Sequence, residues 1–576
     1  METIDILNKS IDKGIRKSFP ELGKQEYEIR LEPTPEDAKG DFGFDCFFLA
    51  KLLKKNPKEI ADEIVEKIGG LPFTSKIEAE GPFINIILEK KDFIRSVVNK
   101  TLDLGKRIGS SDFGSDQTIM IEYSAPNTNK PQHLGHIRNN VLGVSLGNIF
   151  EKAGYDVARV NLINDRGIHI TKSMIAYQKW GENKAPSSAR KKGDHFVGDY
   201  YVMFEQKSKE NPDLLNEAYE MLRQWEQGVE SVLTLWRKMN RWVYKGFQKT
   251  YNRLGCRFDK IYYESDTFRL GRQMVLDALE KNICTKNHKG EVIIDLSKDD
   301  LGVKVLLRRD GTSVYITQDI GTTKLKFDDF SPDLSVFVVA SEQKFHFKIL
   351  FTILKKLGYD WADKCFHFGY GMVYLPEGKM KSREGKVVDA DELMDEMKNL
   401  VKKEIRKKNR DFSAKELNQI SEQVGIGAIK YYILKVHPLK DIHFNPDESI
   451  SFDGDTGPYI QYTYARISSV LKNVKEKIQK SEELLEIGNE EELNIAKQIF
   501  LFKKYVSEAA ISRNPSRISV YLYDLARIFN KFYNKFSILS AESETLSKER
   551  VLLTKSTGIV LKEGLRLLSM EAPEKM

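Results

Sequence analysis

Cysteine, histidine and long hydrophobic stretches are scarce in this chain. The four cysteines are scattered over 576 residues and form no CxxC pair; they are Cys46, Cys256, Cys284 and Cys365. This spacing argues against a disulfide framework and is typical of a protein of the reducing cytoplasm. With nine histidines and no further ligand cluster at zinc-like spacing, we expect no metal site. No apolar run is long enough to cross a bilayer, so a membrane is not an expected partner.

A strong excess of one charge is also missing. The formal net charge is +7 over 576 residues, so a polyanion would have to be bound by local basic patches. The apolar share of 41% and the charged share of 30% are ordinary for a globular protein. The length exceeds what one hydrophobic core accommodates, which predicts several domains.

The pattern of elements changes along the chain and predicts a multidomain α/β protein. Residues 1–105 mix helical segments with alternating strands, which indicates an N-terminal α+β domain. Strands and helices then alternate over 106–390, as in a parallel Rossmann-type nucleotide-binding domain, with an insertion at about 170–300. A charged helical region, 391–455, connects this domain to a C-terminal α-helical bundle, 456–576.

The most informative motif is His133-Leu134-Gly135-His136. It lies between a strand-like run, 118–123, and an amphipathic helical run, 137–152. A helix N-terminus carries free N–H groups and the positive end of the helix dipole, which favours phosphate. Gly135 would let a flat ligand approach the backbone. An HxxH pair alone is more often a surface pair or half of a metal site, so the strand and helix around it carry the prediction of a nucleotide-phosphate site.

A second motif, GKMKSREGK at 378–386, follows a predicted strand at 365–374. It offers four cations and a hydroxyl on a loop with glycines, which suits a polyphosphate whose charge grows in a transition state. Most loops of this composition are only exposed surface. The histidines upstream on the same sheet make the motif specific.

The two motifs resemble the HIGH and KMSKS signatures of class I aminoacyl-tRNA synthetases, and the rest of the chain resembles the arginyl-tRNA synthetases. The segments that match, in the right order, are 122–136, 198–201, 314–319, 457–466, 523–527 and 571–576. The resemblance implies an arginine–tRNA ligase. Such an enzyme activates L-arginine with ATP to arginyl-adenylate and pyrophosphate, then transfers arginine to the terminal ribose of tRNA(Arg).

The resemblance assigns the phosphate chemistry to four expected catalytic residues, His133, His136, Lys130 and Lys379. Ser382 stands where KMSKS has its second lysine, and members without that lysine are expected to use one before the first signature, where Lys130 stands. The alternative is that Lys130 is a surface charge on a turn. Mg²⁺ is expected to accompany ATP. The expected ATP-binding residues are Asn127, His133, Gly135, His136, Met372, Val373, Lys379, Met380, Ser382 and Arg383.

The arginine pocket must hold a guanidinium, a planar set of N–H donors that pairs best with carboxylates. By resemblance, the arginine-binding residues are Glu122, Asn127, Tyr315, Asp319 and Gln343. Asp319 lies four residues after Tyr315, so the two can share one helix face. The alternative for Asp319 is a helix cap or a surface charge, which is the less favoured interpretation even without the resemblance. Glu122 lies in a strand that enters the core, where an unpaired carboxylate is costly, so we expect it to have a partner.

Contact with tRNA(Arg) is assigned by the resemblance to both ends of the chain. The C-terminal helices are expected to read the anticodon, and residues 1–105 to touch the outer corner of the tRNA. Unstacked bases are held by aromatic and polar side chains; the candidates are Tyr459, Gln461, Tyr462, Arg466 and Tyr533. Other aromatic residues at helical spacing are expected in the core: Tyr521, Tyr523, Phe529 and Phe532. We expect the enzyme to act as a monomer.

Three alternatives remain at this point. The first is another class I synthetase. A small nucleotidyltransferase sharing HxGH would not need the C-terminal helices or the Tyr315 and Asp319 pair. A tRNA-binding paralogue without catalysis would be expected to have lost a signature histidine or Lys379, and all of these are present.

Overall fold

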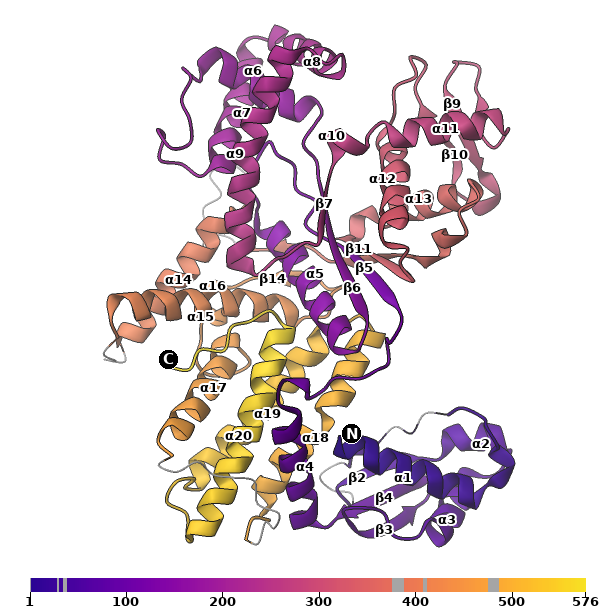
Figure 1. Cartoon of the computed structure of the whole chain (residues 1–576), viewed down its shortest axis with the longest axis vertical. Helices are drawn as coiled ribbons and strands as arrows, with labels where there is room; N and C mark the ends of the chain where they lie inside the picture. The colour runs from indigo at the N-terminus through magenta and orange to yellow at the C-terminus, as the bar shows by residue number, and fades with distance from the viewer. Residues whose placement is uncertain are drawn as a thin grey trace.

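The structure, a computed structural model, describes residues 2–27, 29, 31–34, 39–375, 388–407, 412–474 and 486–576. A central sheet separates a group of helices at one end of the molecule from a helical bundle at the other, and the N-terminal domain lies beside that bundle (Figure 1). The motif at 378–386 falls outside the described residues. No helix in the described ranges is both long and apolar enough to cross a membrane.

An antiparallel sheet with the strand order β1-β2-β4-β3 forms the N-terminal domain. Its elements are α1 (Thr3–Ser18), β1 (Glu32–Pro33), β2 (Phe42–Asp45), α2 (Phe47–Leu53), α3 (Pro57–Ile68), β3 (Thr74–Glu80), β4 (Phe83–Leu88) and α4 (Lys90–Leu104). Helix α1 packs against α3, and α3 packs against β3 and β4. Leu7, Ile11 and Ile15 recur every four residues on α1 and are completely buried, because that spacing places them on one face.

Five parallel strands in the order β12-β11-β5-β6-β7 form the central sheet. The strands are β5 (Thr118–Glu122), β6 (Asp156–Ile163), β7 (Lys260–Tyr263), β11 (Leu334–Ala340) and β12 (Cys365–Tyr370). The helices on its faces include α5 (Leu134–Lys152), α12 (Tyr315–Phe330) and α13 (Lys344–Lys356). The predicted Rossmann-type parallel sheet is therefore confirmed. Because all five strands run the same way, their carboxyl ends meet at one edge, where such sheets bind ligands.

The range predicted as an insertion contains four long helices, a small second sheet and one strand of the main sheet. Its helices are α6 (Ile168–Trp180), α7 (Gly193–Glu210), α8 (Asp213–Glu226), α9 (Glu230–Leu254), α10 (Glu264–Thr267) and α11 (Leu270–Glu280). The second sheet comprises β8 (Thr285–Lys286), β9 (Val292–Leu296) and β10 (Gly302–Leu307). Strand β7 lies within this range, yet it pairs with β6 at the edge of the central sheet. Four residues are too few to produce a periodic signal.

The chain after Val388 is mainly helical, as predicted. The elements are α14 (Ala390–Lys407), α15 (Ala414–Leu434), α16 (Pro446–Ser449), α17 (Gly457–Lys472), α18 (Glu490–Ile511), α19 (Ser516–Lys535) and α20 (Glu544–Leu567). Two short strands, β13 (Val373–Tyr374) and β14 (Ile442–His443), pair in parallel beside the main sheet. Helices α18 and α20 also pack against α4 (Figure 1), so the C-terminal bundle supports the N-terminal domain.

Candidate functional site

The two signature histidines cap the N-terminus of α5 with their own side chains. His133 is the residue before the helix, in an extended conformation, and its Nδ1 accepts a hydrogen bond from the Gly135 N–H at 3.1 Å. His136 Nδ1 accepts from the His133 N–H at 3.3 Å, and the ring centroids are 4.0 Å apart. A neutral imidazole whose Nδ1 accepts carries its proton on Nε2. Both rings can therefore donate an N–H to an anion.

Burial keeps both imidazoles neutral. It lowers the pKa of His133 to about 4; the nearby Lys130 ammonium lowers it further, while Asp389 opposes the shift. The pKa of His136 is also lowered, by burial first and then by His133 and Lys130. A Cβ at Gly135 would lie 3.0 Å from His133 Cε1, so a larger residue there would require the His133 ring to shift. The predicted trio of Lys130 and two histidines is thus brought together.

The chain on either side of the second motif is fixed to the first one. The Leu134 N–H donates to the Val388 carbonyl at 2.9 Å, and the Ala390 N–H donates to Gln132 at 3.0 Å. On the other side, the buried Arg138 guanidinium donates to the Met372 carbonyl at 2.8 Å. Met372 and Val373, two of the predicted ATP-binding residues, therefore lie beside α5. The predicted residues Lys379, Met380, Ser382 and Arg383 lie outside the described residues.

The residues predicted to bind arginine lie at the same edge of the sheet, and all but one are at least partly exposed there. Tyr315 begins α12 and is 75% exposed, and Gln343 and Asn127 are also exposed. Asp319, one turn further along α12, is half-buried and accepts from His346 Nε2 at 2.7 Å. That contact raises the pKa of His346. The exception is Glu122.

Glu122 is buried and is paired with a lysine, as expected for a carboxylate in the core. Its carboxylate forms an ion pair with Lys326 of α12, and both side chains are buried. Glu122 is the last residue of β5, and Lys326 packs over the rings of Tyr262 and Phe337. A carboxylate engaged in this way fixes α12 to the sheet, and α12 carries Asp319.

A second carboxylate, Glu264, lies near enough to Asp319 to repel it and was not among the predicted residues. Glu264 follows β7 at the carboxyl edge of the sheet, and its side chain is 14% exposed. Burial raises its pKa to about 7; Arg166 opposes the shift, while repulsion from Asp165 and Asp319 adds to it. With the Gln318 amide oriented to satisfy its neighbours, its nitrogen donates to Glu264 at 2.7 Å. No sequence signal marked Glu264, because the four residues of β7 that precede it show no period.

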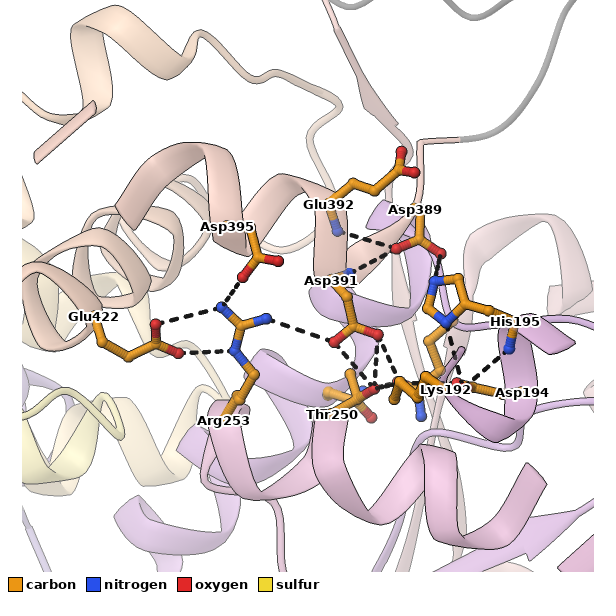
Figure 2. A network of polar contacts seen from close by, with 12 residues as sticks. Lys192, Asp194, His195, Thr250, Arg253, Asp389, Asp391, Glu392, Asp395 and Glu422 are labelled. Carbon is orange, nitrogen blue, oxygen red and sulfur yellow. Dashed lines mark hydrogen bonds and ion pairs between the residues drawn. The ribbon is translucent and has the colours of Figure 1, made fainter. Parts of the chain in front are cut away.

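One cluster has the spacing of metal ligands. Asp194, His195 and Asp391 each place one ligand atom within 4.8 Å of the others. Lys192 Nζ, however, donates to Asp194 at 2.8 Å and to Asp391 at 2.6 Å (Figure 2). Its ammonium already supplies the positive charge between the two carboxylates. We therefore describe the cluster as an ion-pair network that joins α7 to α14.

The residues predicted to bind RNA divide into two groups. Arg466 stacks over the rings of Tyr462 and Tyr533, 5.1 and 4.7 Å from their centroids, and all three are half-buried, as is Tyr459. Gln461 is completely buried and donates to the carbonyl of Glu571 at 2.8 Å. It fixes the C-terminal segment in place and cannot face a ligand.

The aromatic residues expected in the core are largely there. Tyr521, Phe529 and Phe532 are completely buried, while Tyr523 is half-buried and lies 5.8 Å from Tyr459, centroid to centroid. The surface around Tyr459 is thus formed by α17 and α19 together.

Three family models match the chain in sequence. They are described as "Arginyl tRNA synthetase N terminal domain", over residues 5–88, "tRNA synthetases class I (R), catalytic domain", over 98–446, and "DALR anticodon binding domain", over 460–576. Together they span nearly the whole chain, and the second alone matches more than half of it.

Similar proteins agree with these matches. The arginine–tRNA ligase of Porphyromonas gingivalis is 42% identical over 576 residues, covering 96% of each chain. That of Treponema denticola is also 42% identical, covering 99% of this chain and 98% of its own. Among solved structures, the arginyl-tRNA synthetase of Thermus thermophilus superposes with a TM-score of 0.84 at 27% identity, covering 99% of this chain and 100% of its own.

Proposed function

The chain belongs to the arginyl-tRNA synthetase family and is an arginine–tRNA ligase, and we propose how its residues divide that work. In the first step, the carboxylate of L-arginine attacks the α-phosphate of ATP and pyrophosphate leaves. In the second, a hydroxyl of the terminal ribose of tRNA attacks the acyl carbon and AMP leaves. Neither step needs a protein nucleophile, so positioning and charge stabilisation are the main tasks.

We propose that ATP lies over Gly135, with its α-phosphate at the N-terminus of α5. The Nε2–H groups of His133 and His136 would donate to the phosphate oxygens as negative charge develops. Neutral imidazoles suit this role, because their donors stay in place without repelling Lys130. The two Nδ1 contacts support this role, because they leave both Nε2–H groups available to the phosphate.

Lys130 is our candidate for the cation that Ser382 does not supply. It lies close enough to both histidines to lower their pKa values. We propose that it neutralises the leaving pyrophosphate together with Lys379, and that Met380, Ser382 and Arg383 complete the ATP contacts with Asn127, Met372 and Val373. Mg²⁺ would enter with ATP, since it is usually held by substrate phosphates rather than by an all-protein cage.

Arginine would bind with its guanidinium toward Asp319 and Glu264. Asp319 is already oriented by His346 and has a second oxygen for the substrate, and Tyr315 stands one turn away. A bound guanidinium would replace the repulsion between Asp319 and Glu264 by attraction to both. Asn127 and Gln343 are exposed at this edge and suit the α-amino group. Glu122, which is paired with Lys326, would act on the pocket through α12.

For tRNA(Arg), we propose that Tyr459, Tyr462, Arg466 and Tyr533 contact bases of the anticodon loop. Their rings and the Arg466 guanidinium are partly exposed on neighbouring helices, which suits stacking on unpaired bases. Both ends of the active site come from one chain, which supports a monomer. The four cysteines are free, which supports work in the reducing cytoplasm.

The observation that carries this assignment is the pair of neutral histidines and the pair of carboxylates at one edge of the sheet. The test is ATP–pyrophosphate exchange with each amino acid in turn, with and without tRNA. We expect exchange with L-arginine alone among the amino acids. Exchange with another amino acid, or none under either condition, would contradict the proposal.

A further inference from the structure

Asp389 holds together three parts of the active-site region. Its flanking residues Val388 and Ala390 pair with the backbone of Leu134 and Gln132, on either side of His133. Its Oδ1 caps α14 by accepting from the N–H groups of Asp391 and Glu392, at 2.9 and 3.0 Å. Its charge also acts on the His133 imidazole. A residue that positions Asp389 therefore also affects the position and the charge of His133.

The second oxygen of Asp389 forms an ion pair with a residue from the insertion. His195 Nε2 lies 3.0 Å from Asp389 Oδ2, and His195 Nδ1 lies 3.4 Å from Asp194 Oδ1 (Figure 2). His195 belongs to the first turn of α7, some sixty residues from the histidine signature. Each ring nitrogen of His195 thus lies within ion-pair distance of a carboxylate, without the geometry of a hydrogen bond, and two flanking carboxylates favour the imidazolium form.

A second set of polar contacts, made by Lys192 before α7 and by two residues of α9, fixes the same junction. Lys192 Nζ donates to Asp391 and to Thr250 Oγ1, both at 2.6 Å. Arg253 lies 3.6 Å from Asp391 and donates to Glu422 of α15 at 2.7 Å. Several contacts thus tie the start of α14 to the insertion. Among these contacts, the one from His195 is made to Asp389, which pairs with His133.

We propose that His195 is a positioning residue for arginine activation, which acts through Asp389 to hold the backbone pairing at His133 and to neutralise the carboxylate facing that imidazole. The inference rests on the proposed function, because it assigns His195 to the same reaction. His195 touches neither ATP nor arginine in this scheme. It joins the helical insertion to the phosphate end of the site.

The charges around both histidines support this role. Burial alone would lower the pKa of His195, but Asp194 and Asp389 outweigh it and raise the pKa to about 10. His195 is therefore an imidazolium at neutral pH and balances Asp389. The groups that face His133 are Lys130, His136 and Asp389. Without His195, Asp389 would attract a proton to His133 more strongly, and the pKa of His133 would rise.

The test is a double-mutant cycle in the full chain, with His195→Ala, Asp389→Asn and the combination. ATP–pyrophosphate exchange is measured from pH 4 to 9, so that the range reaches the His133 pKa of about 4. The kcat profile is taken at saturating arginine, so that Glu264 does not contribute, and the KM values for ATP and arginine are measured beside it. We expect His195→Ala to lower kcat by roughly 10- to 100-fold, as misplacement near reacting atoms does. The arginine KM should change less than about twofold. The acid limb of the pH profile should move to higher pH.

The double variant distinguishes whether His195 acts through Asp389 or only stabilises the fold. Asp389→Asn keeps the oxygen that caps α14 and removes the charge, so adding His195→Ala should cause little further loss. Losses that multiply, or an unmoved acid limb, would overturn the proposal. His195→Gln should recover part of the rate, because its amide can still donate to Asp389.

A control variant and the wild type complete the experiment. His288→Ala, in the exposed turn between β8 and β9, should match the wild type throughout. If the wild-type chain itself shows no arginine-dependent exchange, the proposed function fails. If it shows exchange and His195→Ala has the wild-type rate and profile, only this inference fails.

Discussion

The two ends of the candidate site carry opposite electrostatic character although they share one edge of one sheet. At the end formed by α5, two imidazoles are held neutral beside Lys130, and a helix N-terminus faces the site. At the end formed by α12 and β7, Asp319 and Glu264 lie close enough to repel one another. The first end favours a polyanion and the second a cation.

Two ends of opposite character can orient a substrate that carries charge at both of its own ends. Arginine bound with its guanidinium at the carboxylates would direct its own carboxylate toward the α-phosphate, where the histidine donors are. Repulsion between Glu264 and Asp319 is tolerable in the free enzyme because Glu264 can be neutral, with a pKa of about 7. Variants at the two ends should therefore change different kinetic constants.

The largest effect is expected at the phosphate end. His136→Ala removes a donor held in place for the transition state, so kcat for ATP–pyrophosphate exchange should fall by about 10²- to 10³-fold. The arginine KM should stay near the wild-type value. His136→Asn, which keeps an N–H donor, should recover part of the rate. Thermal unfolding of both variants checks the fold; a near-normal kcat for His136→Ala would remove this residue from the mechanism.

At the arginine end, Asp319→Ala should raise the arginine KM by roughly 10²-fold, because a guanidinium loses its charged partner. The ATP KM should change little, which would separate the two ends. Asp328→Ala is a matched control: it is an exposed acid on the same helix, paired with Lys324. An unchanged arginine KM in Asp319→Ala would refute the pocket.

A smaller effect is expected in the pH dependence of the arginine KM, which reports on the carboxylate end alone. Below pH 7, Glu264 binds a proton that arginine must displace, so the arginine KM should rise by up to about tenfold for each unit that the pH falls. Above pH 8 it should be level. Glu264→Gln should abolish this dependence and give a high KM throughout. A pH dependence that persists in Glu264→Gln would assign it to another group.

The smallest effect is expected from Lys130→Ala. Lys130 is exposed, so solvent screens its charge, and the loss in kcat should be about 3- to 10-fold. The expected change is in kcat at saturating ATP, measured beside Lys298→Ala, an exposed lysine of the second sheet region. A wild-type rate would leave Ser382 without a substitute cation.

Sequence patterns predicted the fold because the main signals are local. The parallel sheet was visible in the apolar strands, such as 336–340, and in their alternation with helices. Strand β7 was hidden, since four residues in a helical surrounding show no period. Gln461 was predicted to face RNA from its residue type, yet it lies in the core, where its amide joins two backbone carbonyls.

The histidine motif could be interpreted from the sequence because its geometry is made within four residues. His133 and His136 bond to backbone groups two and three positions away. Glu264 could not be identified in this way. Its role depends on Asp319, fifty-five residues along the chain, and on burial that composition does not reveal.

The family and the order of the domains follow from the sequence, because both depend on motifs and on local patterns. The cap on α5 became visible in the structure, but it too depends only on contacts between near neighbours. Only the tertiary structure decided the charges. Burial holds the histidines neutral, and folding brings Glu264 to Asp319 and His195 to Asp389. A side chain's charge is set by the solvent and partners it has after folding, and residues far apart in the chain supply both.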